Sequence, residues 1–397
     1  MDNYEKRVDQ ATSSDPREIL GAISIVVGEE GKTLYHHASG FQSLASDAAP
    51  LGKDSAITLG SAGKFITHIA ALQCVDKGLI NLDEPVYAHL PELESLQIIS
   101  KNEGPDASTK PFTLRFPTKK ITLRHLLTHT SGIASPEATP ELQAWKASKA
   151  DEPEPGEDVR DPIVRMFSMP LLFEPGEGWE YGSSIHWTSL LIFRLTKQRM
   201  AVYVQENIFN PLGMTSSTYQ PASNPEIRAH LLSMVRRDAE GLLFPVNQEP
   251  MDLACSITDL GKVLGDLIAP TSKILSKESV ALIFSPAFPQ GTPASTAIRG
   301  NTENYAAPAG IPPTMKEPPI NYTVLAGLFV EDVLPLSGMP AGTVTWNGMP
   351  NVVWAVNRKK GLAALWGTQL LPVDDEKAVE VMMEFLKGAW AAEFALK

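Results

Sequence analysis

Short hydrophobic runs near both ends of the chain predict β-strands. The run at residues 22–27 is followed by a polar turn and by a second run at 33–37, which together predict a hairpin. Strand-like runs return towards the C-terminal end, at residues 322–330, 343–346, 352–356 and 362–366. Strands at both ends around a helical middle predict one antiparallel sheet that both termini build, with helices on its faces.

Apolar residues three and four positions apart predict helices between these strands. Residues 61–77 show this spacing and are followed by Gly78, a residue that often ends helices. Shorter helices are predicted at 122–129, with Thr122 as its cap, and at 184–197. An amphipathic helix over about residues 377–392 closes the pattern.

Two proline-rich segments interrupt the helical and strand patterns. Residues 136–176 are predicted to form a loop, and residues 305–319 a long surface loop. The resulting fold class is α/β (α+β), with a helical insertion. Residues 1–60 and 290–397 would form the α/β domain, and residues 61–289 a mostly helical domain.

Composition and charge narrow the classes of partner. The 397 residues are 43% hydrophobic and 20% charged, which is ordinary for a globular protein. The formal net charge of −12 argues against nucleic acid and against anionic membrane surfaces, because phosphates would be repelled. No apolar run reaches the ~18–20 residues that span a bilayer, and the first residues are too polar for a signal peptide. We therefore expect a cytoplasmic protein.

Neither cysteine suggests a metal site. Cys74 and Cys255 lie far apart and have no metal-ligand spacing with another cysteine or histidine, so both are expected to be buried thiols. His125 and His129 are four residues apart, and a metal pair is conceivable. No accompanying glutamate pattern supports it, so a structural role in tying a loop near the site is favoured. We expect no metal and no cofactor.

The strongest local signal for chemistry is Ser61-Ala62-Gly63-Lys64. Its serine and lysine lie about one helical turn apart on one face, after Gly60, which allows a tight turn into the helix. At a helix N-terminus the backbone dipole favours the negative charge that develops on a serine hydroxyl. The lysine can stabilise an alkoxide, or take the hydroxyl proton if it is neutral. The pattern is weak alone, because S-x-x-K occurs by chance in many proteins.

A tyrosine in a glycine-rich stretch is a second candidate. Tyr181 follows a Pro-Gly-Glu-Gly turn and precedes a predicted helix, a context that can expose a phenol beside a pocket. A neighbouring lysine ammonium favours the tyrosinate, which could act as a general base. The alternative is that Tyr181 simply packs. Its neighbours Trp179 and Ser183 are candidate substrate contacts.

The third candidate is Trp346-Asn347-Gly348, expected to contact the substrate. A glycine at a strand edge would let a substrate approach the backbone. The amide of Met349 could then pair with the amide of Ser61 as an oxyanion hole. The alternative is a plain hairpin turn, since Asn-Gly is a strong turn signal.

Taken together, these motifs resemble the serine β-lactamase and penicillin-binding-protein superfamily. Within it the chain looks most like class C-like esterases and transesterases, including the lovastatin-type acyltransferases of polyketide pathways. The resemblance covers roughly residues 20–390. It rests on six ordered blocks: Ser61-Ala62-Gly63-Lys64, Leu-Arg-His-Leu-Leu-Thr-His-Thr-Ser-Gly at 123–132, the block around Tyr181, residues 208–214, residues 252–260 and Trp346-Asn347-Gly348.

The resemblance implies a fold and a set of roles. The fold would be an antiparallel sheet flanked by helices plus a mostly helical domain, with the site between them. Ser61 would be the nucleophile, Lys64 its proton-transfer partner and Tyr181 the general base. The third motif has Trp346 where lactamases carry lysine, and the second has Ser183 where they carry asparagine. Both departures point away from β-lactams and towards esters.

The leading hypothesis is a serine acyltransferase or esterase in secondary-metabolite biosynthesis. Its substrate would be a small apolar ester or thioester, with an acyl-carrier-bound donor as one option, and Ser61 would carry the acyl group. One alternative is a cyclase, isomerase or binding protein that reuses the pocket without acyl chemistry. Full activity after Ser61→Ala would identify that case. A third, less favoured hypothesis is a β-lactamase or D-Ala-D-Ala peptidase, and penicillin turnover would support it. The oligomeric state is not predicted.

Overall fold

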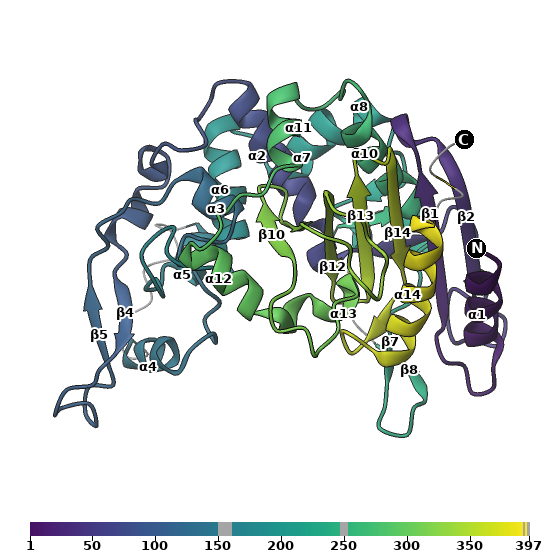
Figure 1. The fold of residues 1–397 in the computed structure, drawn as a ribbon, viewed down its shortest axis with the longest axis horizontal. Helices are drawn as coiled ribbons and strands as arrows, with labels where there is room; N and C mark the ends of the chain where they lie inside the picture. The colour runs from purple at the N-terminus through teal and green to yellow at the C-terminus, as the bar shows by residue number, and fades with distance from the viewer. Residues whose placement is uncertain (150–160, 247–252, 392–393, 395–397) are drawn as a thin grey trace.

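A computed structural model describes residues 1–149, 161–246, 253–391 and 394. These described residues build a seven-stranded antiparallel sheet in the order β10-β11-β12-β13-β14-β1-β2 (Figure 1). Its strands come from both ends of the chain, which confirms the predicted sheet. They are β1 (Gly21–Val27), β2 (Thr33–Gly40), β10 (Ile320–Thr323), β11 (Gly327–Val330), β12 (Thr343–Gly348), β13 (Val352–Asn357) and β14 (Leu362–Gly367).

Helices cover both faces of this sheet, which explains why β1, β13 and β14 are buried along their whole length. On one face, Tyr4 of α1 (Asp2–Ser13) donates a hydrogen bond to Ser24 of β1. On the other, α10 (Ile257–Ile268) comes so close that a Cβ at Gly261 would touch Val27. Because Ser24 and Val27 are an odd number of positions apart, their side chains point to opposite faces. Helix α14 (Glu376–Trp390) packs against α1.

A group of helices lies beside the β10 edge of the sheet (Figure 1). Its centre is the contact of α2 (Lys64–Asp76) with α6 (Ser184–Thr196), and α3 (Leu123–Leu127) packs against α6. The remaining α-helices of the described chain that carry five or more residues are α4 (Pro140–Ser148), α5 (Pro162–Phe167), α7 (Met200–Val204), α9 (Pro225–Ala229), α11 (Lys277–Ile283) and α12 (Pro293–Gly300).

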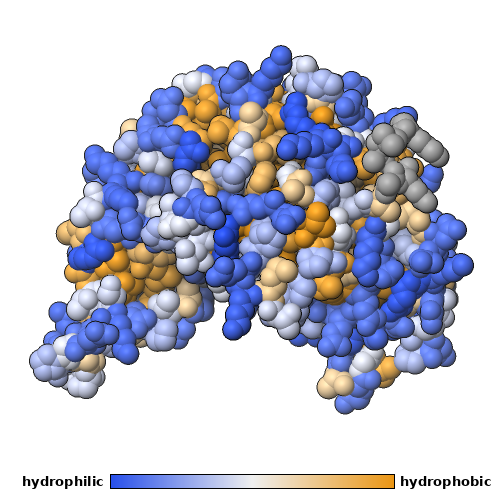
Figure 2. Space-filling model, in the orientation of Figure 1, coloured by the Kyte–Doolittle hydropathy of each residue, from blue (hydrophilic) through white to orange (hydrophobic). Residues whose placement is uncertain are grey.

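Small sheets complete the described fold. The hairpin of β4 (Ile98–Lys101) and β5 (Phe112–Arg115) extends at the left of Figure 1. Figure 2 shows apolar residues over this hairpin, in which Leu114 is exposed, as is Phe116 just after it. The same view shows a hollow between the hairpin and the lobe at the right. The other short strands are β3 (Ala56–Thr58), β6 (Ser217–Thr218), β7 (Val235–Arg237), β8 (Leu243–Pro245), β9 (Ala254–Ser256) and β15 (Leu370–Leu371).

The two predicted loops are only partly loops. Residues 136–149 and 161–176 contain α4 and α5, while residues 150–160 of that segment lie outside the described residues. Thr139 and Asp161 cap these helices, and each is followed by a proline in the first turn. The prolines therefore start helices, where their missing N–H costs nothing.

The segment at 305–319 is not simply a surface loop either. It contains the short helix α13 (Ala306–Ala309), and Tyr305, Ala309 and Ile311 are buried. The predicted strand at 322–330 is also two strands, β10 and β11, joined by a turn in which Ala326 has a φ of 58°. The prolines of residues 305–319 indicated a surface loop although apolar residues of this segment are buried. The continuous apolar run at 322–330 gave no sign of the turn between β10 and β11.

The domain boundaries after residues 60 and 289 stay a prediction. Helix α10 comes from the segment assigned to the helical domain, yet it packs on β1 and β14 of the central sheet. Among the described residues, none of the helices combines the length and the apolar character needed to cross a membrane.

Candidate active site

Ser61 lies on a short 3₁₀ turn, Gly60–Gly63, that leads into α2. The α-helix itself begins at Lys64, three residues later than the apolar spacing predicts. Gly60 has a φ of +51°, a conformation that favours glycine and that makes the tight entry possible. The amide of Leu59 donates to the carbonyl of Leu253 at 3.0 Å, and the indole N–H of Trp354 donates to the carbonyl of Ala62 at 2.9 Å. The turn is therefore fixed on both sides of Ser61.

The structure brings Ser61, Lys64 and Tyr181 together. Lys64 Nζ donates a hydrogen bond to Ser61 Oγ at 2.7 Å. The same ammonium nitrogen lies 5.0 Å from the centre of the Tyr181 ring, within the range of a cation–π contact. Lys64 thus contacts both Ser61, the candidate nucleophile, and Tyr181, the candidate general base.

Tyr181 is held by contacts from two other segments. The indole N–H of Trp346, on β12, donates to Tyr181 Oη at 3.3 Å, and the two ring centres are 5.1 Å apart. The backbone before Tyr181 is fixed by His129, whose carbonyl accepts the amide N–H of Glu180 at 2.9 Å. Trp346 is therefore a partner of Tyr181 as well as a lining residue, which the sequence did not indicate.

Gly348 lies against the turn that carries Ser61. A Cβ at this position would lie 2.0 Å from the carbonyl oxygen of Leu59 and 2.9 Å from the amide nitrogen of Ala62. The glycine therefore lets β12 approach the turn that carries Ser61, and its contact with a substrate stays a prediction. A Cβ at Gly60 would in turn lie 3.3 Å from the amide nitrogen of Met349, so the amide of Met349 lies beside the Ser61 turn.

A cavity of about 160 Å³ opens beside Ser61. Five of the predicted residues line it, namely Ser61, Tyr181, Trp346, Asn347 and Met349. Three others, Glu303, Val373 and Asp374, line it without any signal in the sequence. Glu303 belongs to the short 3₁₀ helix Thr302–Asn304, and Val373 and Asp374 lie in a turn before α14, so no periodic pattern or motif marks them.

Asp374 is held beside the cavity by its backbone. It has a φ of +58°, and its amide N–H donates to Asn351 Oδ1 at 2.9 Å. The amide group of Asn351 donates to the carbonyls of Leu370 and Pro372 at 2.8 and 2.9 Å. Burial raises the pKa of the Asp374 carboxyl. With Glu303, the cavity has two carboxyl groups on its wall as well as the Ser61 hydroxyl.

Two predicted substrate contacts lie elsewhere. Ser183 is buried at the start of α6, and Trp179 is buried beside Tyr181, with ring centres 6.2 Å apart. Neither lines the cavity formed by the described residues. Their contact with a substrate stays a prediction.

The two histidines of the 123–132 block make backbone contacts. His125 accepts the amide N–H of Thr122 at 3.2 Å and completes a capping box at the start of α3. His129 contacts the segment around Tyr181 and is fully buried. Burial lowers the pKa of both imidazoles, to about 4 for His125.

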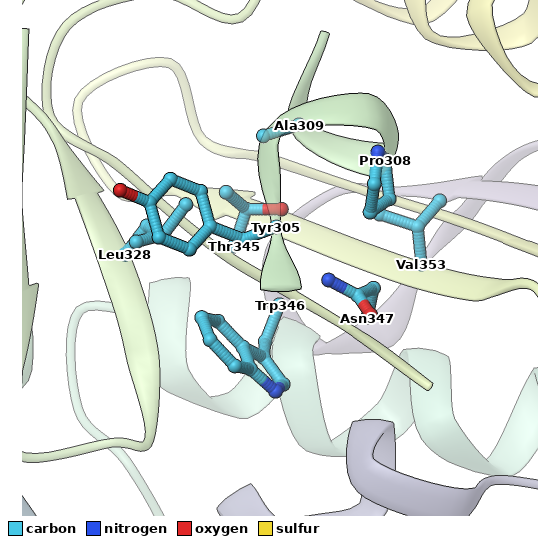
Figure 3. Close-up of a pocket in the computed structure, with 8 residues that line it drawn as sticks. All are labelled: Tyr305, Pro308, Ala309, Leu328, Thr345, Trp346, Asn347 and Val353. Atoms are coloured by element: carbon cyan, nitrogen blue, oxygen red, sulfur yellow. The ribbon is translucent and has the colours of Figure 1, made fainter. Parts of the chain in front are cut away.

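A second, closely packed pocket lies against Trp346 (Figure 3). Tyr305, Pro308 and Ala309, from and beside α13, cover one side of it, and β12 forms the other. The ring centres of Tyr305 and Trp346 are 6.3 Å apart. The segment predicted as a loop therefore supports the indole that contacts Tyr181.

The chain is similar to known proteins along nearly its whole length. The family described as Beta-lactamase matches residues 10–386. Acyltransferase calJ of Penicillium decumbens is 33% identical, covering 91% of this chain and 87% of its own length. Lovastatin esterase of Penicillium rubens is 29% identical, with 94% of each chain covered. A mutant of simvastatin synthase LovD from Aspergillus terreus has a TM-score of 0.86 at 28% identity, with 98% of both chains covered.

Proposed function

This chain belongs to the Beta-lactamase family, and on that premise we propose that it is a serine acyltransferase or esterase. Its substrate would be a small apolar ester or thioester, and its pathway one of secondary metabolism. The names of its relatives support this, since they include an acyltransferase, a lovastatin esterase and a monacolin J acid methylbutanoyltransferase. The single observation that carries the proposal is the 2.7 Å contact from Lys64 Nζ to Ser61 Oγ beside a cavity that Tyr181 also lines.

Acylation begins when Ser61 Oγ attacks the carbonyl carbon of the donor. The hydroxyl proton passes to the Lys64–Tyr181 pair, and the carbonyl oxygen becomes an oxyanion. The amide N–H groups of Ser61 and Met349 are the proposed donors to that oxyanion. As the tetrahedral adduct collapses, the bond to the leaving oxygen or sulfur breaks. The pair then returns the proton to the leaving group.

Deacylation repeats these steps with a second nucleophile. An acceptor alcohol or water gives its proton to the Lys64–Tyr181 pair and attacks the acyl carbon. The ester bond to Ser61 breaks, and Ser61 Oγ recovers the proton. Transfer and hydrolysis therefore differ only in which nucleophile reaches the acyl group, and exclusion of water from the cavity would favour transfer.

The walls of the cavity support an ester rather than a β-lactam. Trp346 stands where the resemblance places a lysine in lactamases, and its indole N–H is an uncharged donor that already contacts Tyr181. Glu303 and Asp374 add carboxyl groups to the same wall. Such a wall favours a neutral substrate over one with a carboxylate, because like charges repel.

Mass spectrometry after incubation with activated esters tests the acyl-enzyme directly. We expect one acyl group on the peptide that contains Ser61 and no such adduct in Ser61→Ala. The exposed serine Ser95 provides the control, since Ser95→Ala should label like the parent protein. Absence of an adduct across several acyl chain lengths would contradict the proposal. An added alcohol in the same assay measures the partition between transfer and hydrolysis.

An acyl-carrier-bound donor and a cytoplasmic location are further proposals. Both rest on the sequence. Activity with a carrier-bound acyl group, compared with the same acyl group on a small thiol, would test the first. Localisation of the tagged full chain would test the second.

A further inference from the structure

A group of buried polar side chains lies beside Tyr181, whose ring centre is 4.8 Å from that of His129 and 6.2 Å from that of Trp179. It comprises His68 of α2, His129 after α3, Trp179, and Tyr322 of β10. Each is at most 3% exposed. Each also carries a buried polar atom for which the described residues provide no hydrogen-bond partner: Nε2 of both histidines, Nε1 of Trp179 and Oη of Tyr322. Buried polar atoms are nearly always paired, so four of them in one group call for a ligand.

Hydrogen bonds on the other ring nitrogens define which atoms are donors. His68 Nδ1 lies 2.9 Å from the carbonyl oxygen of Val324, so this nitrogen carries the proton and Nε2 is an acceptor. His129 Nδ1 faces the amide N–H of Gly182 at 3.5 Å, so its proton lies on Nε2, which is a donor. The two histidines therefore present complementary atoms, provided that both are neutral.

Their surroundings keep both imidazoles neutral. Burial lowers the pKa of His68 to about 4 and that of His129 well below its ordinary value. The Lys64 ammonium acts in the same direction on both, and the neighbouring His68 adds to the effect on His129. The other titratable groups packed against His129 are Tyr181 and Tyr322, whose ring centres lie 4.8 and 6.0 Å away. Burial raises the pKa of Tyr322, so that phenol is neutral too.

The spacing of the rings suits one small bridging molecule. The ring centres of His68 and His129 are 6.4 Å apart. A direct N–H···N bond between the two rings would need a separation of about 5 Å or less. Trp179 and Tyr322 lie 6.4 and 6.0 Å from His129, and 5.5 Å from each other.

We propose that these four side chains form a binding site for one water molecule, and that this site holds Tyr181 in place through His129. The water accepts from His129 Nε2–H and Trp179 Nε1–H, and donates to His68 Nε2 and Tyr322 Oη. Two donors and two acceptors match the four hydrogen bonds that a buried water makes at most. The site is a structural one, and no covalent step takes place in it.

The link to Tyr181 runs through the backbone. His129 has a φ of +56°, and its carbonyl and ring accept the amides of Glu180 and Gly182, the residues on either side of Tyr181. A hydrogen bond at Nε2 fixes the orientation of the His129 ring. Its Nδ1 atom therefore keeps facing the amide N–H of Gly182. His129 is thus a positioning residue for Tyr181, and its effect on catalysis rests on the proposed function.

Nitrogen NMR of histidine-labelled protein tests the site without any catalytic assay. The chain has eight histidines, and single His→Gln or His→Asn variants assign the signals. We expect His68 as the Nδ1–H tautomer and His129 as the Nε2–H tautomer, both neutral at pH 6. A crystal structure should show one water within hydrogen-bond distance of both Nε2 atoms. A different tautomer at either histidine, or a direct contact between the two rings, would overturn the proposal.

Kinetics of His129 variants test the positioning role. His129→Asn tolerates the positive φ and keeps an acceptor near the Nδ1 position, but it lacks the outer N–H. We expect kcat to fall about tenfold or more, with KM changed less than twofold, because a misplaced base slows chemistry more than binding. His129→Gln places an N–H near the Nε2 position and should recover part of kcat. The dependence of kcat on pH should also differ between His129→Asn and the parent protein.

His68→Asn is the second variant, because it keeps a donor to Val324 and removes only the acceptor. It should reproduce the loss in kcat. His125→Gln is the control: it removes a half-buried imidazole, keeps the capping box and should leave kcat unchanged. Unchanged kcat and pH profile in both His129→Asn and His68→Asn would refute the positioning role. If the water and tautomers are found but Ser61 never becomes acylated, the proposed function fails while the water site stands.

Discussion

Trp346 connects two parts of the site that lie 165 residues apart in the chain. Its indole is 2% exposed, packs on Tyr181 and Tyr322, and donates to Tyr181 Oη. An indole N–H is a donor without charge, so it can stabilise a tyrosinate without adding a cation to the cavity. A residue expected to bind substrate therefore also supports the proposed base.

Replacing this indole by a phenyl ring removes the N–H and keeps most of the apolar contact. We expect Trp346→Phe to slow acylation about tenfold to hundredfold, because the proposed base Tyr181 loses the hydrogen-bond donor that stabilises its anionic form. Single-turnover release of a chromogenic leaving group measures the step. Trp390→Phe on α14 is the control and should acylate at the parent rate. Equal rates for both variants would show that the Trp346 N–H is not used.

The sequence predicted the residues of the site that belong to local motifs. Ser61 and Lys64 share a helical turn, and Tyr181 follows a recognisable glycine-rich turn. Glu303 and Asp374 could not be found in this way, because no local motif marks them and only the fold brings them to the cavity. The hydrogen bond from Trp346 to Tyr181 likewise depends on the fold, because it joins β12 to the segment that precedes α6.

At the scale of elements, the site depends on how closely β12 lies against the turn that carries Ser61. The strand can approach because Gly348 has no side chain, and the indole of Trp354 on β13 ties the same turn to the sheet. The position of Ser61 is therefore fixed relative to β12 and β13 of the central sheet. Strand alternation alone predicts β12, but it does not predict what the strand touches.

Gly348→Ala would place a methyl group 2.0 Å from a backbone oxygen. Because backbone cannot give way as a flexible side chain can, we expect a loss of about 1–3 kcal/mol in the free energy of unfolding and a large loss of acylation. Urea unfolding and the Ser61 adduct assay measure the two effects. Gly52→Ala, where an added Cβ meets open space, is the control. Parental stability and acylation in Gly348→Ala would show that β12 is not held this tightly.

At the scale of the whole molecule, histidines with a lowered pKa link stability to pH. Loss of hydration is the largest cause of the lowered pKa at His36, His68, His125, His129 and His186. His68 and His129 are fully buried, His36 and His125 are half-buried, and His186 is exposed. The unfolded chain binds protons at these sites below about pH 6.5, whereas the folded chain binds them only at lower pH. The unfolded state thus carries more protons in this window, and stability falls as pH falls. Raised carboxyl pKa values at Glu180 and Asp374 act in the opposite direction.

We therefore expect the free energy of unfolding to decrease between pH 7 and pH 5. His68, fully buried with a pKa of about 4, contributes about 2 kcal/mol of this decrease by itself. Urea unfolding at the two pH values measures it. His68→Gln should weaken the dependence. A midpoint that does not move between the two pH values would contradict the assignment of neutral buried histidines.

The order of the central sheet also has a consequence for synthesis. Strand β1 is buried along its length and lies between β2 and β14, and β14 is among the last elements of the chain to be made. A ribosome therefore releases β1 with an unpaired apolar edge, which persists until residues 362–367 emerge. Through most of translation the nascent chain exposes a surface prone to aggregation. Slow synthesis or early termination would thus yield insoluble fragments rather than a partly folded domain.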